Sequence, residues 1–396
     1  MNKLSVKNLD LKGKRIFLRV DFNVPLNENL QITDDTRIRA VLPTIGYLLN
    51  QDVRLIIASH LGRPKGKYKP ELSLKPVQQK LSEILNQEVT LAPQVIGPEV
   101  ERLKEDLKEK QILLLENLRF HPGETENDDQ FARELAQGID YYVNDAFGAC
   151  HRAHASVVGI TKFIQTCAAG FLVEKEIEYL GRALASPDRP FVAILGGAKV
   201  SDKIPVIENL LGKVDHLLIG GAMAYTFFKA KGKEVGKSLV EEDKIEIAKK
   251  IMAEAAEKKI NFQLPVDSLV AERKESNVPV KIIKDEPFPE SYIGLDIGPE
   301  TIRQYSEIIS QAKMIVWNGP MGVFEIEDFS RGTTAIARAV AESRAVSIVG
   351  GGDSVAAVYK AGVKNKITHI STGGGASLEF LAKGTLPGIE VLTEKI

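Results

Sequence analysis

The sequence predicts an α/β protein built from two doubly wound parallel-sheet domains. Apolar runs rich in β-branched residues alternate with longer segments of helical periodicity, which is typical of βαβ units whose parallel sheets carry helices on both faces. A length of 396 residues exceeds what one hydrophobic core comfortably holds. The loops that follow the strands also change in composition halfway along the chain. Because ligands of open α/β sheets bind beyond the carboxyl ends of the strands, we expect two different ligand sites.

Four segments have the periodicity of helices. Thr36 to Leu49 and Leu74 to Leu85 lie in the first half of the chain, and Glu242 to Lys258 and Thr333 to Ser343 lie in the second. They alternate with the apolar runs and so complete the βαβ pattern in both halves.

A further helix is predicted between the two halves, in the segment from Gly170 to Pro190. Apolar residues recur there at spacings of three to five, and a Ser-Pro-Asp-Arg-Pro sequence follows them. This pattern indicates an amphipathic helix over about residues 171–186, which is either an ordinary surface helix or a connector between domains. We expect a first domain over residues 1–170 and a second over 171–381, with the helix counted in the second.

The composition of the chain excludes several classes of function. The 52 Lys and Arg residues balance 53 Asp and Glu residues, so the net charge of -1 gives no overall field that would favour nucleic acid or a membrane. Two cysteines cannot build a disulfide framework and suit a reducing compartment. The N-terminal residues lack the apolar core of a signal peptide, and the longest apolar stretches are strand-sized. We therefore expect a cytoplasmic protein.

Cationic side chains follow the apolar runs of the first half. Four segments carry them: RVDFNVP, IIASHLGRP, LLLENLRFHPGE and VNDAFGACHRAH. Arginine matches carboxylate and phosphate oxygens with two hydrogen bonds, so several arginines at one sheet edge would suit a small, multiply anionic substrate. Each arginine alone could equally be a surface ion-pair partner. The residues that lie in or just after these segments are Arg37, Arg63, Arg119 and Arg152, together with His60, His121 and His154.

Two short polar residues and a histidine pair have competing interpretations. Asp21 and Asn23 come directly after a predicted strand, where they could bind a hydroxyl or serve as turn and cap residues. His151 and His154 lie close to Cys150, but no second pair of ligands occurs at a spacing that zinc would use. We therefore do not expect a metal at that position.

The second half carries glycine-rich turns where the first half carries arginines. Gly350 to Ser354 and Gly373 to Ser377 each contain three consecutive glycines, and each follows an apolar run. Such turns leave backbone N–H groups free to face an anion at the start of a helix. Asp353 could hold Mg²⁺ against nucleotide phosphates, with a helix N-cap as the alternative role. Lys199 and Lys203, at a predicted helix start, would reach the same phosphates from one helix face unless both are merely solvated.

Two familiar nucleotide-binding signatures are missing. The sequence has no G-x-G-x-x-G, which argues against a dinucleotide site. The nearest approach to a P-loop, Gly232 to Ser238, is one residue too short and follows no predicted strand. We interpret that segment as an exposed loop.

The chain resembles the phosphoglycerate kinase family in eight motifs, which occur in the order of that family: VDFNVP, HLGRP, LLENLRFHPGE, NDAFGACHRAHAS, LGGAKVSDKI, WNGPMGVFE, GGGDS and STGGGASLE. The resemblance runs from about Leu4 to the C-terminus. One departure is Ser354, where many relatives have threonine, and this change retains the hydroxyl. The resemblance implies two Rossmann-like domains with a cleft between them, a hinge-closing motion, and a C-terminal segment of about residues 382–396 that packs on the first domain. It also favours a monomer.

The resemblance further implies transfer of the acyl phosphate of 1,3-bisphosphoglycerate to ADP, giving 3-phosphoglycerate and ATP. The first domain would bind the triose phosphate and the second the nucleotide, with Mg²⁺ on Asp353. Arg37, Lys199, Gly373 and Gly374 would stabilise the phosphoryl group during transfer. The implied triose ligands are Asp21, Asn23, Arg37, His60, Arg63, Arg119 and Arg152. The implied nucleotide ligands are Lys203, Gly221, Gly294, Asn318, Glu325, Gly351, Gly352, Asp353 and Ser354.

The chemistry of the residues agrees with this assignment. The acceptor in the reverse direction is a carboxylate that is already ionised near neutral pH, so positioning and charge neutralisation suffice and no general base is needed. One alternative is a kinase for a sugar-like hydroxyl with Asp21 as the base. A second alternative is a two-lobed, non-catalytic anion-binding protein, which would not need two triple-glycine turns.

Overall fold

The computed structural model describes residues 2–284 and 286–395. Met1 and Ile396, the outer limits of the predicted domains, lie outside the described residues. The chain divides into two compact units. Unit 1 contains the described residues up to Glu178 and those from Thr385 onward, and unit 2 runs from Tyr179 to Gly384. The chain passes from unit 1 to unit 2 within helix α6 (Phe171–Ala185).

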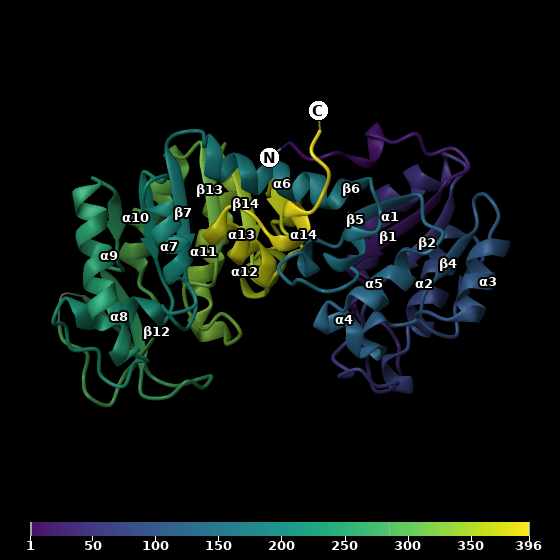
Figure 1. The fold of residues 1–396 in the computed structure, drawn as a ribbon. Coiled ribbons are helices and arrows are strands. Elements are labelled where there is room, and N and C mark those ends of the chain that lie inside the picture. The colour runs from purple at the N-terminus through teal and green to yellow at the C-terminus, as the bar shows by residue number, and fades with distance from the viewer. Residues whose placement is uncertain (1, 285, 396) are drawn as a thin grey trace. The chain divides into compact units, whose positions relative to one another are not determined.

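Unit 1 is built on a parallel sheet of six described strands in the order β3-β4-β2-β1-β5-β6 (Figure 1). Its strands are β1 (Arg15–Val20), β2 (Arg54–Ala58), β3 (Val89–Leu91), β4 (Ile112–Leu114), β5 (Tyr141–Asp145) and β6 (Cys167–Ala169). Its helices are α1 (Thr36–Leu49), α2 (Lys75–Leu85), α3 (Pro98–Asp106), α4 (Pro122–Glu126), α5 (Asp129–Ala136) and α14 (Pro387–Glu390). The strands are parallel, so their carboxyl ends share one edge.

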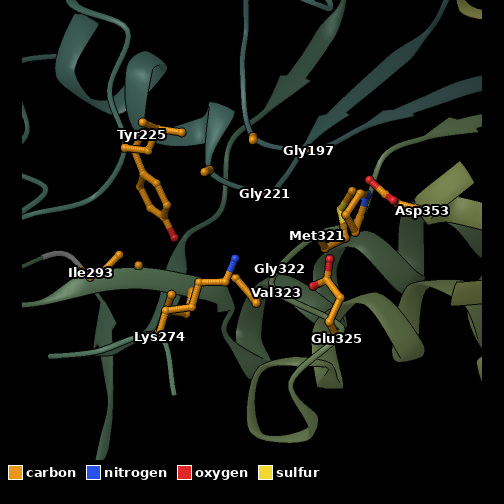
Figure 2. Close-up of a pocket in the computed structure, with 16 residues that line it drawn as sticks. Gly197, Gly221, Tyr225, Lys274, Ile293, Met321, Gly322, Val323, Glu325 and Asp353 are labelled. Atoms are coloured by element: carbon orange, nitrogen blue, oxygen red, sulfur yellow. The ribbon is translucent and has the colours of Figure 1, made fainter. Parts of the chain in front are cut away.

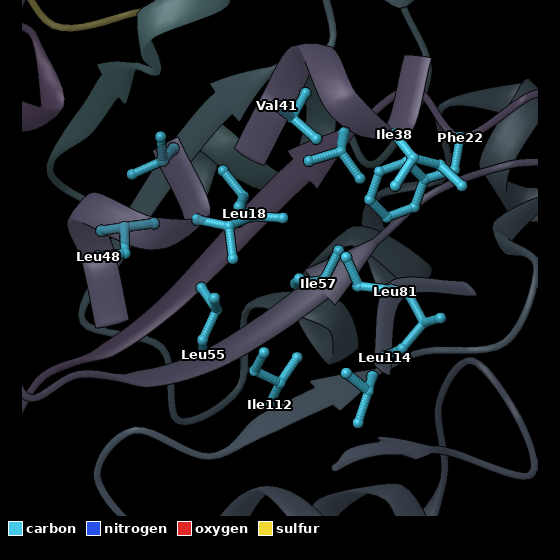
Figure 3. Close-up of a cluster of buried hydrophobic side chains, with 14 of the residues drawn as sticks. Leu18, Phe22, Ile38, Val41, Leu48, Leu55, Ile57, Leu81, Ile112 and Leu114 are labelled. Atoms are coloured by element: carbon cyan, nitrogen blue, oxygen red, sulfur yellow. The ribbon is translucent and has the colours of Figure 1, made fainter. Parts of the chain in front are cut away.

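The core of unit 1 explains why β1, β2 and α1 form where they do. Leu18, Leu55 and Ile57 on adjacent strands pack with Ile38 and Val41 of α1, and all five are buried (Figure 3). The central strands are apolar along almost their whole length because helices cover both faces of a parallel sheet. Each fully buried aliphatic side chain contributes about 1.5–3 kcal/mol relative to an exposed one.

Two segments distant in sequence complete unit 1. The N–H of Leu4 donates to the carbonyl oxygen of Thr393 at 2.8 Å, and the N–H of Thr393 donates to that of Cys167 at 2.9 Å. The N–H of Gly388 donates to the carbonyl oxygen of Cys150 at 2.8 Å. The C-terminal segment is therefore attached to the edge strand β6 and to the loop after β5. Both cysteines are buried free thiols.

Unit 2 contains a second parallel sheet of six described strands, in the order β15-β14-β13-β7-β8-β9. Its strands are β7 (Phe191–Leu195), β8 (His216–Ile219), β9 (Asn261–Gln263), β13 (Met314–Asn318), β14 (Val346–Gly350) and β15 (His369–Ile370). Its helices are α7 (Ile204–Leu210), α8 (Met223–Ala230), α9 (Ile245–Glu257), α10 (Pro299–Gln311), α11 (Arg331–Glu342), α12 (Gly352–Lys360) and α13 (Gly375–Lys383). The predicted fold class of two doubly wound parallel sheets is confirmed.

Unit 2 also contains a small antiparallel sheet that the sequence did not predict. It has the order β11-β10-β12, with β10 (Asp267–Ala271), β11 (Val280–Lys284) and β12 (Ile293–Ile297). The GLDIG segment therefore belongs to this sheet and not to the parallel one. In the part of the chain that the structure describes, no helix combines the length and the apolar character needed to cross a membrane.

Candidate active site

The strand-end residues of unit 1 form a cationic cluster around one carboxylate. Asp21 follows β1, and its Oδ2 accepts a hydrogen bond from Nη1 of Arg37 at 2.5 Å. Its Oδ1 accepts the backbone N–H of Asn23 at 3.1 Å and lies 4.0 Å from Nε2 of His60. Burial raises the pKa of Asp21, but interactions with His60, Arg37 and Arg19 and the hydrogen bond from the N–H of Asn23 outweigh burial and leave the pKa below its usual value. Asp21 is therefore an ionised, paired carboxylate.

The loop after β2 is held by two of the predicted triose ligands. The N–H of Gly62 donates to Oδ1 of Asn23 at 2.8 Å, and Nη1 of Arg119 donates to the carbonyl oxygen of Gly62 at 2.7 Å. Gly62 has φ +61°, and a Cβ there would lie 2.7 Å from a Leu72 methyl carbon, so glycine is favoured at this turn. Asn23 and Arg119 thus fix the loop that carries His60 and Arg63.

The guanidinium groups of this cluster crowd one another. Burial lowers the pKa of Arg119 to about 10, and the charges of Arg19 and Arg152 add to the effect. Arg63 and Arg152 are exposed at the same edge. Crowded cations with few carboxylate partners make a local site for an anion, because a bound anion relieves their repulsion.

Two predicted histidines have structural roles. Nδ1 of His121 accepts the N–H of Gly123 at 3.1 Å, and its ring stacks on Phe131 with the ring centroids 4.2 Å apart, so it caps α4. His154 is buried, with its Nδ1 3.8 Å from Oε1 of Glu124. Burial, together with the charges of Arg119, Arg19 and Arg152, lowers the pKa of His154 to about 3.

Sequence reasoning missed the buried support of this cluster. Arg19 is fully buried at the end of β1, and its Nε donates to Oγ of Ser156 at 2.8 Å. Oε1 and Oε2 of Glu124 accept the hydroxyl and the N–H of Ser156 at 2.7 and 2.9 Å. The signal was present in the sequence as an arginine inside the otherwise apolar run RIFLRV.

In unit 2, three strand ends meet so closely that their turns require glycine. A Cβ on Gly221, after β8, would lie 2.5 Å from the backbone N and O of Gly197, after β7. A Cβ on Gly319, after β13, would lie 2.2 Å from the carbonyl oxygen of Gly196. These turns therefore bring backbone groups directly to the carboxyl edge of the sheet.

A cavity of about 330 Å³ opens at this edge. It is lined by both predicted lysines, by Asp202 and by the turns that precede α12 and α13. Nζ of Lys203 donates to Oδ1 of Asn318, and Nδ2 of Asn318 donates to the carbonyl oxygen of Gly350 at 2.9 Å. Burial lowers the pKa of Lys203, although Asp202 and Asp353 oppose this. The predicted residues that line the cavity are Lys199, Lys203, Asn318, Gly351, Gly352, Asp353, Ser354 and Gly374.

The predicted placement of the two lysines on one helix face is wrong. Helix α7 begins at Ile204, so Lys199 and Lys203 both lie in the turn between β7 and α7. Pro205 suits the first turn of a helix, which explains the late start. Gly373 is buried and lies beside the cavity-lining Gly374, with its carbonyl oxygen accepting the N–H of Ala376 at 3.0 Å.

Asp353 does not cap a helix. The N-cap of α12 is Gly351, and Asp353 lies exposed inside the first turn. Among the described residues, no group of three or more His, Cys, Asp or Glu residues could hold a metal ion. A single carboxylate that lines the cavity with the two lysines nevertheless suits Mg²⁺, which takes one or two protein oxygens and completes its shell with phosphate and water. Ser354 is buried, and its Oγ accepts the N–H of Gly319 at 2.5 Å.

A second cavity of about 320 Å³ adjoins the first, and Gly197 and Asp353 line both (Figure 2). It contains the predicted residues Gly221, Gly294 and Glu325. A Cβ on Gly294 would lie 2.1 Å from the hydroxyl oxygen of Tyr225, so glycine is required there. Sequence reasoning missed Tyr225, Leu239, Lys274, Ile293, Met321 and Val323. A largely apolar cavity joined to a lysine-rich one has the form that a nucleotide needs, with a flat base at one end and phosphates at the other.

The family model for phosphoglycerate kinase matches residues 6–384. The chain belongs to the phosphoglycerate kinase family. Curated relatives of that name include those of Koribacter versatilis, 56% identical over 403 residues, and Moorella thermoacetica, 57% identical over 395 residues, and each alignment covers 100% of both proteins.

Solved structures agree with the family assignment. Phosphoglycerate kinase from Coxiella burnetii is 44% identical with a TM-score of 0.92, and that from Pyrococcus horikoshii is 37% identical with a TM-score of 0.84. Each comparison covers 98% of both chains. The chain is thus a phosphotransferase of a family that moves phosphate between 1,3-bisphosphoglycerate and ADP in glycolysis.

Proposed function

We propose that the cationic edge of unit 1 binds 3-phosphoglycerate or 1,3-bisphosphoglycerate, and that the paired cavities of unit 2 bind ADP or ATP. The observation that carries this proposal is the pair of joined cavities, one lined by apolar residues and the other by two lysines, a carboxylate and glycine turns. Phosphoglycerate kinase chemistry needs a carboxylate-phosphate substrate and a nucleotide, and each unit offers a site of matching charge.

In unit 1, the substrate phosphate and carboxylate lie against guanidinium groups. Arg63 and Arg152 are exposed and can swing onto an anion, whereas Arg119 and Asn23 hold the intervening loop in place. Asp21 and His60 face each other at 4.0 Å, a gap in which a substrate hydroxyl can donate to the carboxylate and accept from the ring. The proposed triose ligands are Asp21, Asn23, Arg37, His60, Arg63, Arg119 and Arg152.

In unit 2, the base and ribose occupy the apolar cavity, where Gly221 and Gly294 permit close approach and Glu325 accepts from ribose hydroxyls. The phosphates lie against Lys203 and the first turn of α12, whose early N–H groups have no partner inside the helix. Gly351, Gly352 and Asn318 line this part, and Ser354 supports the neighbouring turn. Asp353 holds Mg²⁺, which when bound neutralises phosphate charge and orients the oxygens for transfer.

The transfer itself depends on charge neutralisation. Arg37 and Lys199 place positive charge near the phosphoryl group during transfer. The turn at Gly373 and Gly374 supplies N–H groups that donate to the same phosphoryl oxygens. No general base is required. Asp21 would be a poor base in any case, because its paired carboxylate has a lowered pKa. The pKa of Asp21 therefore argues against a kinase for a sugar-like hydroxyl.

Direct transfer requires the two bound substrates to meet with water excluded, since water would hydrolyse the acyl phosphate. We therefore propose that the two units close on each other during turnover, with the ends of α6 as candidate hinge positions. Two buried thiols suit a reducing compartment, so we also propose a cytoplasmic location. The proposed oligomeric state is a monomer, which equilibrium sedimentation would check.

The decisive experiment is a coupled assay of ATP consumption with purified protein. We expect ATP to be consumed only when both 3-phosphoglycerate and Mg²⁺ are present. Glycerate, which has the hydroxyl groups but lacks the phosphate, serves as the matched control substrate and is expected to be inactive. Consumption that depends on a sugar and not on 3-phosphoglycerate would contradict the proposal.

A further inference from the structure

One hydrogen bond sets the protonation of the His60 ring. Nη2 of Arg19 lies 3.3 Å from Nδ1 of His60, and both side chains are buried. A guanidinium group has only donors, so the imidazole nitrogen that faces it must be the acceptor. Nδ1 therefore carries no proton, and in a neutral ring the proton is on Nε2.

Arg19 cannot turn away from this contact. Its Nε donates to Oγ of Ser156 at 2.8 Å, and its Nη1 donates to the carbonyl oxygen of Val20. Glu124 balances its charge, with Oε1 4.0 Å from Nη2, and binds both polar groups of Ser156. The guanidinium is thus held by β1 itself and by the segments that carry Glu124 and Ser156.

The opposite nitrogen of the ring faces the proposed triose site. Nε2 of His60 lies 4.0 Å from Oδ1 of Asp21, which is too far for a hydrogen bond. Oδ2 of Asp21 is already taken by Arg37. The Nε2–H therefore points to a position where a ligand oxygen can accept it while donating its own proton to Asp21.

Burial keeps the His60 ring neutral, and the neighbouring arginines act in the same direction. Burial lowers the pKa of His60 well below its usual value, and Arg19 on β1, Arg119 after β4 and Arg37 on α1 act in the same direction. Asp21, after β1, is the group that opposes them. A cationic ring would also lose the hydrogen bond from Arg19, because both nitrogens would then be donors.

We propose that Arg19 is a positioning residue that locks His60 as the neutral Nε2–H tautomer, so that the ring presents one fixed donor to an acceptor oxygen of the triose. The proposal rests on the assignment of unit 1 as the triose site. It separates the roles of the arginines, since Arg19 is fully buried and acts through His60, whereas Arg63 and Arg152 are exposed to the substrate.

The tautomer can be measured without substrate. Long-range proton–nitrogen correlation spectra of the ¹⁵N-histidine protein distinguish a bare ring nitrogen from a protonated one, and His60→Gln assigns the signal among the 6 histidines. We expect His60 to show a bare Nδ1 and a protonated Nε2, unchanged between about pH 5 and 8. An Nδ1–H tautomer, or a ring that titrates in this range, would overturn the proposal whatever the protein's substrate is.

The functional role is tested with Arg19→Lys and Arg19→Met. Loss of one charge-assisted hydrogen bond is expected to raise the KM for 3-phosphoglycerate about tenfold and to leave the KM for ATP unchanged. The matched control is Arg39→Lys, because Arg39 is exposed and pairs with Asp35 on the surface of α1. An unchanged KM for 3-phosphoglycerate in a folded Arg19 variant would contradict the proposal.

A double-mutant cycle separates positioning from general support of the fold. If Arg19 acts through His60, Arg19→Lys should raise the KM far less when His60 is already glutamine. Equal effects in both backgrounds would show that Arg19 acts elsewhere and would overturn the proposal. Should Arg19→Met fail to fold, the wild-type spectrum still tests the tautomer, and the KM of Arg19→Lys still tests the effect on 3-phosphoglycerate binding. Absence of 3-phosphoglycerate turnover in the wild type would instead refute the proposed function and leave the tautomer measurement intact.

Discussion

Arg37 and Asp21 form a close ion pair at the carboxyl edge of the unit 1 sheet, with 2.5 Å between Nη1 and Oδ2. The guanidinium of Arg37 remains partly exposed, whereas the carboxylate is largely covered. Arg37 is therefore oriented by Asp21 and still has donors to offer to a ligand. This arrangement fixes the direction of a positive charge before substrate arrives, which is the requirement for electrostatic stabilisation of a transferring group.

Replacing Arg37 with alanine should affect turnover far more than nucleotide binding. Its charge acts on the phosphoryl group in transfer, so we expect kcat to fall by roughly 10²–10³ while the KM for ATP changes less than about twofold. Steady-state kinetics with both substrates varied would measure this. Arg39→Ala, two residues along the same helix and exposed, is the control. Equal losses in kcat and in nucleotide affinity would refute the role.

Asp21→Asn distinguishes a binding carboxylate from a general base. Loss of a general base lowers rates by about 10²–10⁴ and removes the corresponding limb of the pH profile. Because the pKa of Asp21 is lowered and Arg37 already pairs with it, we expect instead a roughly tenfold rise in the KM for 3-phosphoglycerate. The pH dependence of kcat should keep its shape. Disappearance of its acidic limb would revive the hydroxyl-kinase alternative.

Local sequence signals sufficed to place polar residues at the ends of strands. Asp21, His60 and Asp353 each follow an apolar run, and each parallel sheet brings such positions to its own carboxyl edge. The periodicity of Thr36 to Leu49 likewise gave the bounds of α1 correctly, because that helix buries one continuous stripe.

The remaining features depend on contacts between distant segments. The apolar run around Arg19 indicates burial, but the partners of its guanidinium, Ser156 and Glu124, lie more than 100 residues away in the sequence. Lys274 lies in a polar stretch after β10, and the antiparallel pairing of β10 with β11 and β12 brings it to the largely apolar cavity of unit 2. No local pattern in one sequence reports such partners, since register is set by tertiary packing.

Asp353→Asn should raise the magnesium requirement of the enzyme. The change removes the negative charge of a hard oxygen ligand but keeps the shape of the side chain, so we expect the Mg²⁺ concentration for half-maximal rate to rise roughly tenfold or more. Turnover measured over a magnesium series at fixed ATP would show it. Asp243→Asn, at an exposed surface pair with Lys244, should leave the series unchanged. If turnover depended on the Mg²⁺ concentration identically in wild type and Asp353→Asn, Asp353 would not be a magnesium ligand.

Asp296 should make the stability of unit 2 depend on pH. Asp296 is buried, and its Oδ2 accepts the N–H of Gly332 at 2.6 Å and its Oδ1 that of Ile297 at 2.9 Å. Burial raises the pKa of Asp296 to about 7, although both N–H groups oppose the shift. The folded state then binds a proton that the unfolded state has released, so stability present below about pH 4 is lost as the pH rises toward 7.

The pH effect of Asp296 should disappear in Asp296→Asn, which cannot ionise. A shift of about three pKa units corresponds to an upper limit on the order of 4 kcal/mol across this range. Urea unfolding at several pH values should therefore show a midpoint that falls between about pH 4 and 7 in the wild type and in the exposed control Asp106→Asn, with a flatter course in Asp296→Asn. If the urea midpoint of Asp296→Asn fell with pH as steeply as that of the wild type, Asp296 would already be ionised in the folded protein. Its two N–H donors would then outweigh burial.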